Sequence, residues 1–184
     1  MNQIKINYNY EILLLLLKKE THQRELAKQL NTSLTRVQSA LRDLRNINVV
    51  DYNVVGKNHI YSIKKNIISK AQILNAENYK LIKLLRKHQE FEPMFNQIIE
   101  KCDKELIVLF GSYAKGIENK DSDIDIYVDS KNIKIKNELR NIYDKLSIQV
   151  RKFDINDLLI KEIMKNHIII KGGEIFYEKQ GFFE

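Results

Sequence analysis

Residues 106–129, LIVLFGSYAKGIENKDSDIDIYVD, decide the fold of the C-terminal part of the chain. The stretch begins with a continuous apolar run that ends at Gly111, a pattern that predicts a buried strand followed by a turn. Ser112 follows the turn, and a second apolar strand interrupted by Asp123 and Asp125 comes after ten further residues. Core strands seldom carry two acidic side chains, so these residues need a chemical explanation as well as a structural one.

Asp123 and Asp125 are two residues apart, so in a strand their side chains point to the same face. Two like charges there are costly unless a cation lies between them, and a hard cation such as Mg²⁺ takes carboxylate and phosphate oxygens. Gly111 allows the backbone to approach a phosphate, Ser112 offers a hydroxyl and an amide, and a helix starting near Tyr113 would point N–H groups at the anion. The two motifs together predict a site for a metal ion and a nucleotide.

The order Gly-Ser, a spacer of about ten residues and Asp-x-Asp on the next strand resembles the signature of the DNA polymerase beta superfamily, in particular its minimal nucleotidyltransferases. The resemblance covers residues 101–177. It implies an α/β fold with a small mixed sheet, one or two Mg²⁺ ions, ATP as the expected substrate, and transfer of AMP to a hydroxyl of a protein or other acceptor. The candidate residues are Asp123 and Asp125 for catalysis and metal binding, and Gly111, Ser112, Tyr113, Lys115 and Ser122 for nucleotide binding.

The same resemblance suggests a partner, because members of the minimal family often act as the antitoxin of a two-gene module and modify a small helical toxin. The rival hypothesis is a DNA-binding regulator whose nucleotidyltransferase domain only senses a nucleotide or docks a partner. A third possibility is a surface Gly-Ser turn followed by an accidental acidic pair in a loop. The identity of the nucleotide and of the acceptor is not encoded in a readable pattern.

Catalytically complete members of the superfamily carry a third carboxylate on the strand that corresponds here to residues 147–153, and this stretch has no acid. The nearest acid is Asp154, directly after it. Asp154 could bend into the site, Gln149 or Arg151 could occupy the place of the acid, or the protein could bind a nucleotide without turning it over. Asp154 could also be a simple helix N-cap.

The chain has 184 residues, enough for two small domains, and its 43% hydrophobic and 30% charged residues are typical of a soluble protein. The longest early apolar run, residues 12–17, is too short to span a bilayer and lacks a cleavage site, so we expect a cytoplasmic protein with no membrane partner. The single cysteine, Cys102, excludes an internal disulfide and is expected as an apolar residue at a helix end. The four histidines are scattered, so no zinc site is predicted.

The N-terminal third is basic: residues 1–65 hold 11 Lys and Arg against 5 Asp and Glu, net +6 of the chain's total of +7. Helical spacing predicts a buried helix over 8–19, a second helix capped by Thr21 and a third capped by Ser33. Two strand-like runs, 49–52 and 59–63, flank a turn. Three helices followed by a hairpin make a winged helix-turn-helix domain.

This order resembles winged helix-turn-helix DNA-binding domains, in which the third helix enters the major groove of duplex DNA and the hairpin touches the backbone or the minor groove. Polar side chains opposite the apolar stripe of the third helix, together with the hairpin tip, are the candidates for DNA contacts. They are Thr35, Arg36, Gln38, Ser39, Arg42 and Lys57. The alternative is a solvated polar face on a domain used for protein contacts or dimerisation.

The predicted domains are a winged helix-turn-helix over residues 1–65, a helical linker over 66–100 and a nucleotidyltransferase domain over 101–184. The linker is expected to contain a helix capped at Ser69 and another started by Pro93, with enough apolar residues to pack between domains or against a second copy of the chain. Further elements are predicted as a helix over 134–146, a strand over 147–153, a helix over 158–165, a strand over 168–170 and an edge strand over 175–177.

Overall fold

The computed structural model describes residues 6–102 and 105–183. It divides into two compact units, the first ending at Tyr79 and the second running from Lys80 to Phe182. Each unit has its own apolar core. None of the helices in these described ranges is long and apolar enough to cross a membrane.

One helix, α4 (Ile67–Lys87), belongs to both units, because the division between them falls inside it. Ala76 of α4 is buried in the core of the first unit, and Leu84 is buried in the core of the second. Much of the segment predicted as a linker, residues 66–100, is therefore helix that contributes side chains to the two cores.

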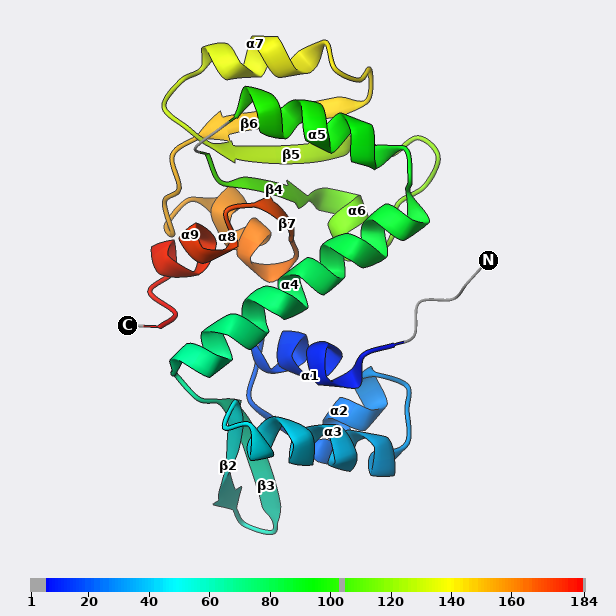
Figure 1. The fold of residues 1–184 in the computed structure, drawn as a ribbon, viewed down its shortest axis with the longest axis vertical. Coiled ribbons are helices and arrows are strands. Elements are labelled where there is room, and N and C mark those ends of the chain that lie inside the picture. The colour runs from blue at the N-terminus through cyan, green and yellow to red at the C-terminus, as the bar shows by residue number, and fades with distance from the viewer. Residues whose placement is uncertain (1–5, 103–104, 184) are drawn as a thin grey trace. The chain divides into compact units, whose positions relative to one another are not determined.

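The first unit contains three helices and a small antiparallel sheet of strand order β1-β3-β2 (Figure 1). Its elements are α1 (Tyr8–Leu16), β1 (Thr21–His22), α2 (Gln23–Gln29), α3 (Leu34–Asn46), β2 (Val50–Val55) and β3 (Asn58–Ile63). Apolar side chains of all three helices pack against the base of the β2–β3 hairpin, where Val50 and Tyr61 are buried. The unit is a winged helix-turn-helix, as the sequence predicted.

The helix starts of this unit confirm one prediction and correct two. Ser33 caps α3, since its hydroxyl accepts a hydrogen bond from the Arg36 amide. Thr21 does not cap α2, because it pairs with β3 in the sheet, and His22 Nδ1 accepts the bond from the Glu25 amide instead. The expected cap at Ser69 is also wrong.

Ser69 lies inside α4, which begins two residues earlier at Ile67. Its amide donates to Asn66 Oδ1 at 2.8 Å, and its buried hydroxyl donates to the carbonyl of Val49. Asn66 thus supplies the cap, and Ser69 fastens the first turn of α4 to the start of the hairpin.

The second unit is built on a mixed four-stranded sheet of order β6-β5-β4-β7, in which β5 and β6 are parallel and the other neighbours antiparallel. Besides the end of α4, its elements are α5 (Phe91–Lys101), β4 (Ile107–Phe110), α6 (Gly111–Lys115), β5 (Ile124–Asp129), α7 (Lys134–Arg140), β6 (Leu146–Arg151), α8 (Leu158–Lys165), β7 (Ile168–Lys171) and α9 (Gly173–Lys179). Helices α5 and α7 lie together beside β5 and β6 in Figure 1, and their apolar side chains join the strands in one core. The small mixed α/β sheet is as predicted.

The last helix corrects the sequence prediction, which expected an edge strand over 175–177. Gly172 has φ +85° and turns the chain against the backbone of Leu106, and α9 follows directly. Phe176 and Tyr177 are both buried, and the Phe176 ring packs nearly perpendicular to that of Phe153. A strand would point these two neighbouring side chains to opposite faces, whereas the helix buries both.

Two other predictions concern α7 and Cys102. The helix expected over 134–146 is shorter: it ends at Arg140 with Asn141 as its C-cap, and Leu146 already belongs to β6. Cys102 forms the C-cap of α5 and is fully buried, as predicted. Burial raises the pKa of its thiol to about 11, so this cysteine is a structural apolar residue and not a nucleophile at neutral pH.

Candidate functional site

The turn between β4 and α6 brings the glycine and one acid of the two motifs into contact. Phe110, the last residue of β4, stands opposite Asp125 of β5. Gly111 follows with φ +71°, and a Cβ atom added there would overlap Asp125 Oδ2 and lie 3.0 Å from its Cγ. Only glycine leaves room for this carboxylate against the backbone of the turn.

The second acid, Asp123, lies exposed immediately before β5, and Asp125 is half-buried near the start of that strand. Burial raises the pKa of the Asp125 carboxyl, a hydrogen bond with Ser147 lowers it, and the negative charge of Asp123 raises it again. Ser147 of β6 is the register partner of Asp125. The negative charges of Asp123 and Asp125 therefore repel each other, and a cation bound between them would relieve this repulsion.

The predicted nucleotide-binding residues of α6 have unequal surroundings. Ser112 is half-buried beside Gly111, at the start of the helix. The Tyr113 ring packs on Phe91 of α5 at a centroid distance of 5.1 Å, so this side chain anchors α6 to the core. Lys115 Nζ lies 2.7 Å from Glu162 Oε1 of α8, and a phosphate would have to exchange with this carboxylate to use the lysine.

Ser122 holds the loop before Asp123. Its hydroxyl accepts a hydrogen bond from the Asn119 amide at 2.9 Å, and its own amide donates back to the Asn119 carbonyl. The hydroxyl of Ser122 keeps its proton free to donate, but its placement makes it first a part of the loop structure.

Glu162 is a residue of the site that sequence reasoning missed. Its negative charge also raises the pKa of Asp125, after the effects of burial, Ser147 and Asp123. Glu162 lies on α8 between the buried residues Ile160 and Ile163, far along the chain from the two motifs. No local pattern marks it, because only the tertiary fold brings α8 toward the acidic pair.

Asp154 is not brought to this pair. The parallel register places Ser147 opposite Asp125 and Arg151 opposite Asp129, so β6 runs away from the site toward its end. At about 3.3 Å per residue, the four residues from Asp125 to Asp129 already span roughly 13 Å, and Asp154 lies beyond them.

Asp154 and the residues near it have local structural roles. The Asp154 Oδ1 atom accepts a hydrogen bond from the Asn156 amide. The N-cap of α8 is Asp157 and not Asp154, because Asp157 Oδ1 accepts from the Leu159 amide. Arg151 pairs with Asp157 at 3.1 Å, and Gln149 stands opposite Tyr127. None of the three residues considered for the place of a third acid supplies a carboxylate beside Asp125.

The donor set fits a hard cation shared with a substrate. Within residues 6–102 and 105–183, no three His, Cys, Asp or Glu side chains form a ready-made metal cage. Mg²⁺ is commonly bound by one or two carboxylates and completes its shell with water and phosphate oxygens. Asp123 and Asp125 provide that number of protein ligands, next to a glycine turn that a phosphate can approach.

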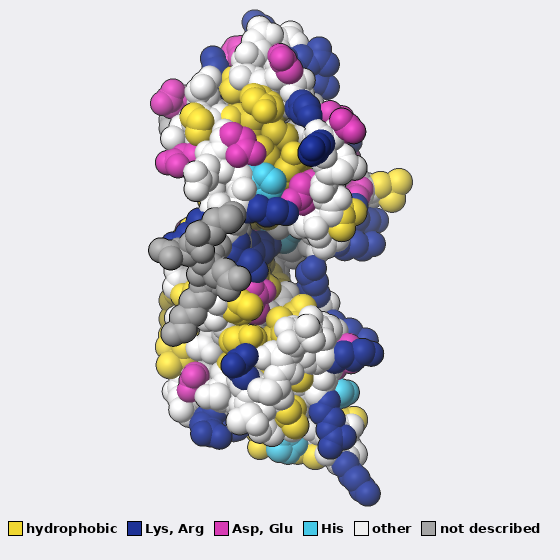
Figure 2. Space-filling model, turned by 90° about the vertical axis from the view of Figure 1, so that its right-hand side faces the viewer, with side chains coloured by type: hydrophobic (Ala, Val, Ile, Leu, Met, Phe, Trp, Pro, Cys, Tyr) yellow, Lys and Arg dark blue, Asp and Glu magenta, His cyan; other side chains and the backbone are white. Residues whose placement is uncertain are grey.

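The candidate DNA-binding residues of α3 fall on two faces of the helix. Val37, Leu41 and Leu44 are buried in the core. Opposite them, four polar side chains are exposed on the outer face: Thr35, Gln38, Ser39 and Arg42. Lys57 is exposed at the turn of the hairpin, and dark-blue basic side chains project from that lower end of the molecule in Figure 2.

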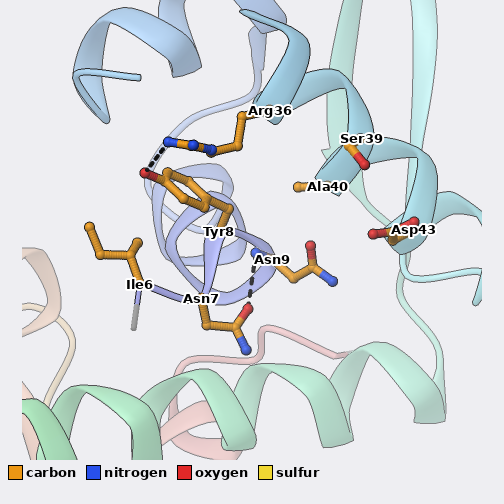
Figure 3. Close-up of a pocket in the computed structure, with 8 residues that line it drawn as sticks. All are labelled: Ile6, Asn7, Tyr8, Asn9, Arg36, Ser39, Ala40 and Asp43. Atoms are coloured by element: carbon orange, nitrogen blue, oxygen red, sulfur yellow. Dashed lines mark hydrogen bonds between the residues drawn. The ribbon is translucent and has the colours of Figure 1, made fainter. Parts of the chain in front are cut away.

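Arg36 faces the start of α1 instead. Its Nη1 donates to the Tyr8 hydroxyl at 3.2 Å and to Thr32 Oγ1 at 3.3 Å, beside an open pocket of about 450 Å³ between α1 and α3 (Figure 3). Arg45, which was not predicted, lies on the other flank of α3 with its guanidinium 4.5 Å from the Tyr52 ring centroid. The outer face is thus bordered by one arginine held at α1 and another held at the hairpin.

Residues 96–181 match the family model described as "Polymerase beta, Nucleotidyltransferase". The second unit is a nucleotidyltransferase domain of the polymerase beta type, and the protein joins it to a winged helix-turn-helix unit. Proteins of this family generally use a nucleoside triphosphate and a divalent metal.

Among solved structures, the chain is similar to the adhesin competence repressor AdcR of Streptococcus pyogenes, with 20% identity over 54% of this chain and 69% of that one and a TM-score of 0.36. It is also similar to a mutant form of Lactococcus lactis ZitR, with 18% identity over 50% of this chain and 62% of that one and a TM-score of 0.38. Such scores do not define a fold, which the helices and hairpin described above establish. No curated protein matches the chain.

Proposed function

We propose that the second unit binds a nucleoside triphosphate together with Mg²⁺ at Gly111, Ser112, Asp123 and Asp125, and transfers a nucleoside monophosphate to a hydroxyl acceptor. AMP from ATP is the expected transfer. The observation that carries the proposal is the packing of the Asp125 carboxylate against the glycine of the Gly-Ser turn, with Asp123 beside it. This arrangement supports the proposal because the candidate metal ligands and the candidate phosphate-binding backbone lie at adjoining strand ends.

The chain's own groups would act mainly by position and charge. Bound Mg²⁺ would neutralise the triphosphate and stabilise the charge that develops during transfer. Asp123 and Asp125 would hold the cation, the backbone at Gly111 would lie against the phosphates, and Ser112 would donate its hydroxyl and amide to a phosphate oxygen. Lys115 would add a positive charge once it leaves Glu162.

Removal of the acceptor proton has no obvious base, because β6 carries no acid and the residue opposite Asp125 is Ser147. General-base assistance is commonly worth about 100- to 10,000-fold in rate, so we expect slow turnover compared with a complete site. Incubation of the protein with ATP labelled in the adenosine part, with and without Mg²⁺, tests the transfer. Label on a protein acceptor supports the enzyme. ATP binding with no label on the protein or on candidate acceptors supports a nucleotide sensor.

The acceptor class follows from the family resemblance rather than from geometry. A small helical toxin is the expected partner in a two-gene module, and a cytoplasmic location agrees with that role. The product of the adjacent gene is the first acceptor to test. The alternative role is a regulator that docks a partner on the nucleotidyltransferase domain.

We further propose that the first unit binds duplex DNA through the outer face of α3 and the hairpin. The supporting observations are the four exposed polar side chains opposite the core of α3 and the net charge of +6 over residues 1–65. A solvated face used for protein contacts is the alternative.

The two arginines of α3 give a sharp test of this face. We expect Arg42→Ala to weaken DNA binding and lower the slope of log K against log salt by about one, because one phosphate contact is lost. Arg36→Ala is the matched control and should have the smaller effect, since Arg36 is hydrogen-bonded to Tyr8 and Thr32. Fluorescence anisotropy on the full chain measures both. Unchanged binding in Arg42→Ala would exclude the outer face.

A further inference from the structure

The loop between α6 and β5, residues 116–123, joins the two halves of the nucleotide site and is fastened at several points. Lys145 Nζ donates to the Lys120 carbonyl, and Asn119 and Ser122 close a hydrogen-bonded turn. The most buried fastening is Glu118, whose side chain is only 8% exposed although it belongs to a surface loop. This burial needs an explanation, since an ionised carboxylate is seldom buried unless a charged or hydrogen-bonding partner compensates for the lost water.

Glu118 binds the end of α4. Its Oε1 accepts from Lys87 Nζ and lies 3.1 Å from His88 Nε2. The hydrogen bond from Lys87 lowers the pKa of the Glu118 carboxyl, although burial acts in the opposite direction, so the group stays ionised at neutral pH. Its Oε2 is buried without a hydrogen-bond partner among the described atoms, so the contacts of this carboxylate with Lys87 and His88 both run through Oε1.

His88 also contacts α6, the helix that begins at Gly111. Its ring stacks on Phe91 at 5.0 Å and 17°, and meets Tyr113 edge-on at 5.2 Å and 81°. Tyr113 directly follows Ser112 in α6. One histidine therefore contacts both the loop that leads to Asp123 and the helix that presents Ser112.

We infer that Glu118 is a positioning residue, which, through Lys87 and His88, fixes the loop 116–123 and with it the separation of Ser112 from the acidic pair. The inference rests on the proposed function, because a fixed separation matters only if one ligand is held by both ends of the loop. Binding groups on opposite sides of a ligand must be set to within a fraction of an ångström, and ordering a loose loop would lower affinity. A residue with a purely structural role would change stability but leave the affinity of the folded protein unchanged.

The experiment compares Glu118→Ala with Glu118→Gln and with Glu138→Ala, an exposed glutamate on α7. In the protein without nucleotide, we expect amide hydrogen exchange in the loop to accelerate about tenfold in Glu118→Ala, with core amides of β4 and β5 unchanged. In calorimetry with ATP and Mg²⁺, the same variant should bind about tenfold more weakly. Glu118→Gln keeps an acceptor for Lys87 and His88 and should recover most of the affinity, and Glu138→Ala should behave as wild type.

Three results would overturn the inference. Unchanged loop exchange in Glu118→Ala shows that the carboxylate does not hold the loop. Accelerated exchange with unchanged affinity for ATP and Mg²⁺ shows that the loop does not set the site, while the proposed function stands. If the wild-type chain binds no nucleotide with Mg²⁺, the proposed function fails and the positioning role fails with it, even where loop exchange responds as described.

Discussion

Replacing Gly111 by alanine is expected to abolish nucleotide binding and to destabilise the second unit. Two effects combine at this position. A side chain at φ +71° costs about 1–2 kcal/mol, and the new Cβ would overlap the Asp125 carboxylate, which has to move out of the acidic pair. Calorimetry with ATP and Mg²⁺ gives the binding, and urea unfolding gives the free energy of unfolding.

Gly116→Ala is the matched control for this experiment. Gly116 has φ +70° but nothing lies within 4 Å of its Cβ position, so the substitution adds the backbone strain without the overlap. We expect a loss of about 1–2 kcal/mol and a much smaller loss of nucleotide affinity than in Gly111→Ala. Equal effects of the two substitutions on affinity would show that contact with Asp125 is not what requires a glycine.

The second large effect is expected from the double substitution Asp123→Asn, Asp125→Asn. It removes the charges that would hold Mg²⁺ while keeping the shape of both side chains, so affinity for ATP with Mg²⁺ should fall roughly 100-fold or more. The fold should survive and even gain stability at neutral pH. Burial raises the pKa of Asp125, which means that the folded state disfavours its ionised form.

Asp154→Asn is the control, because Asp154 lies beyond the far end of β6 and serves a local turn. The affinity of the Asp154→Asn variant for ATP with Mg²⁺ and its rate of label transfer should match those of the wild-type protein. If the double variant binds as tightly as wild type, the nucleotide site lies elsewhere. If Asp154→Asn abolishes label transfer but leaves the affinity for ATP with Mg²⁺ unchanged, Asp154 is the third catalytic carboxylate.

The sequence predicted those parts of the molecule whose causes are local. A short apolar run, the glycine that directly follows it and an acidic pair two residues apart in the next apolar run are sufficient to place β4, the turn at Gly111 and β5. The winged helix was predictable for the same reason, since apolar spacing defines α3 and Ser33 marks its start. The family match at residues 96–181 confirms the resemblance on which the activity was inferred.

The errors and omissions have tertiary causes. Thr21 is a good N-cap by type, but pairing with Tyr61 takes it into a strand. Phe176 and Tyr177 have strand propensity, yet both are buried by a helix. Glu162 of α8 acts on the charge of Asp125, and Glu118 is bound by Lys87 and His88 at the end of α4. No spacing rule in the sequence connects those helices to the two motifs.

Because α4 contributes side chains to both cores, it affects how each unit can fold. Helix formation is cooperative, and a helix of about ten residues without a core to pack on is marginal in water. Ala76 fills the first core and Leu84 the second, so a chain cut after residue 65 leaves a cavity where α4 should be, and a chain begun at residue 101 lacks Leu84. A fragment that keeps either core whole must therefore include the part of α4 that packs in it, and the boundaries 65 and 101 do not meet this condition.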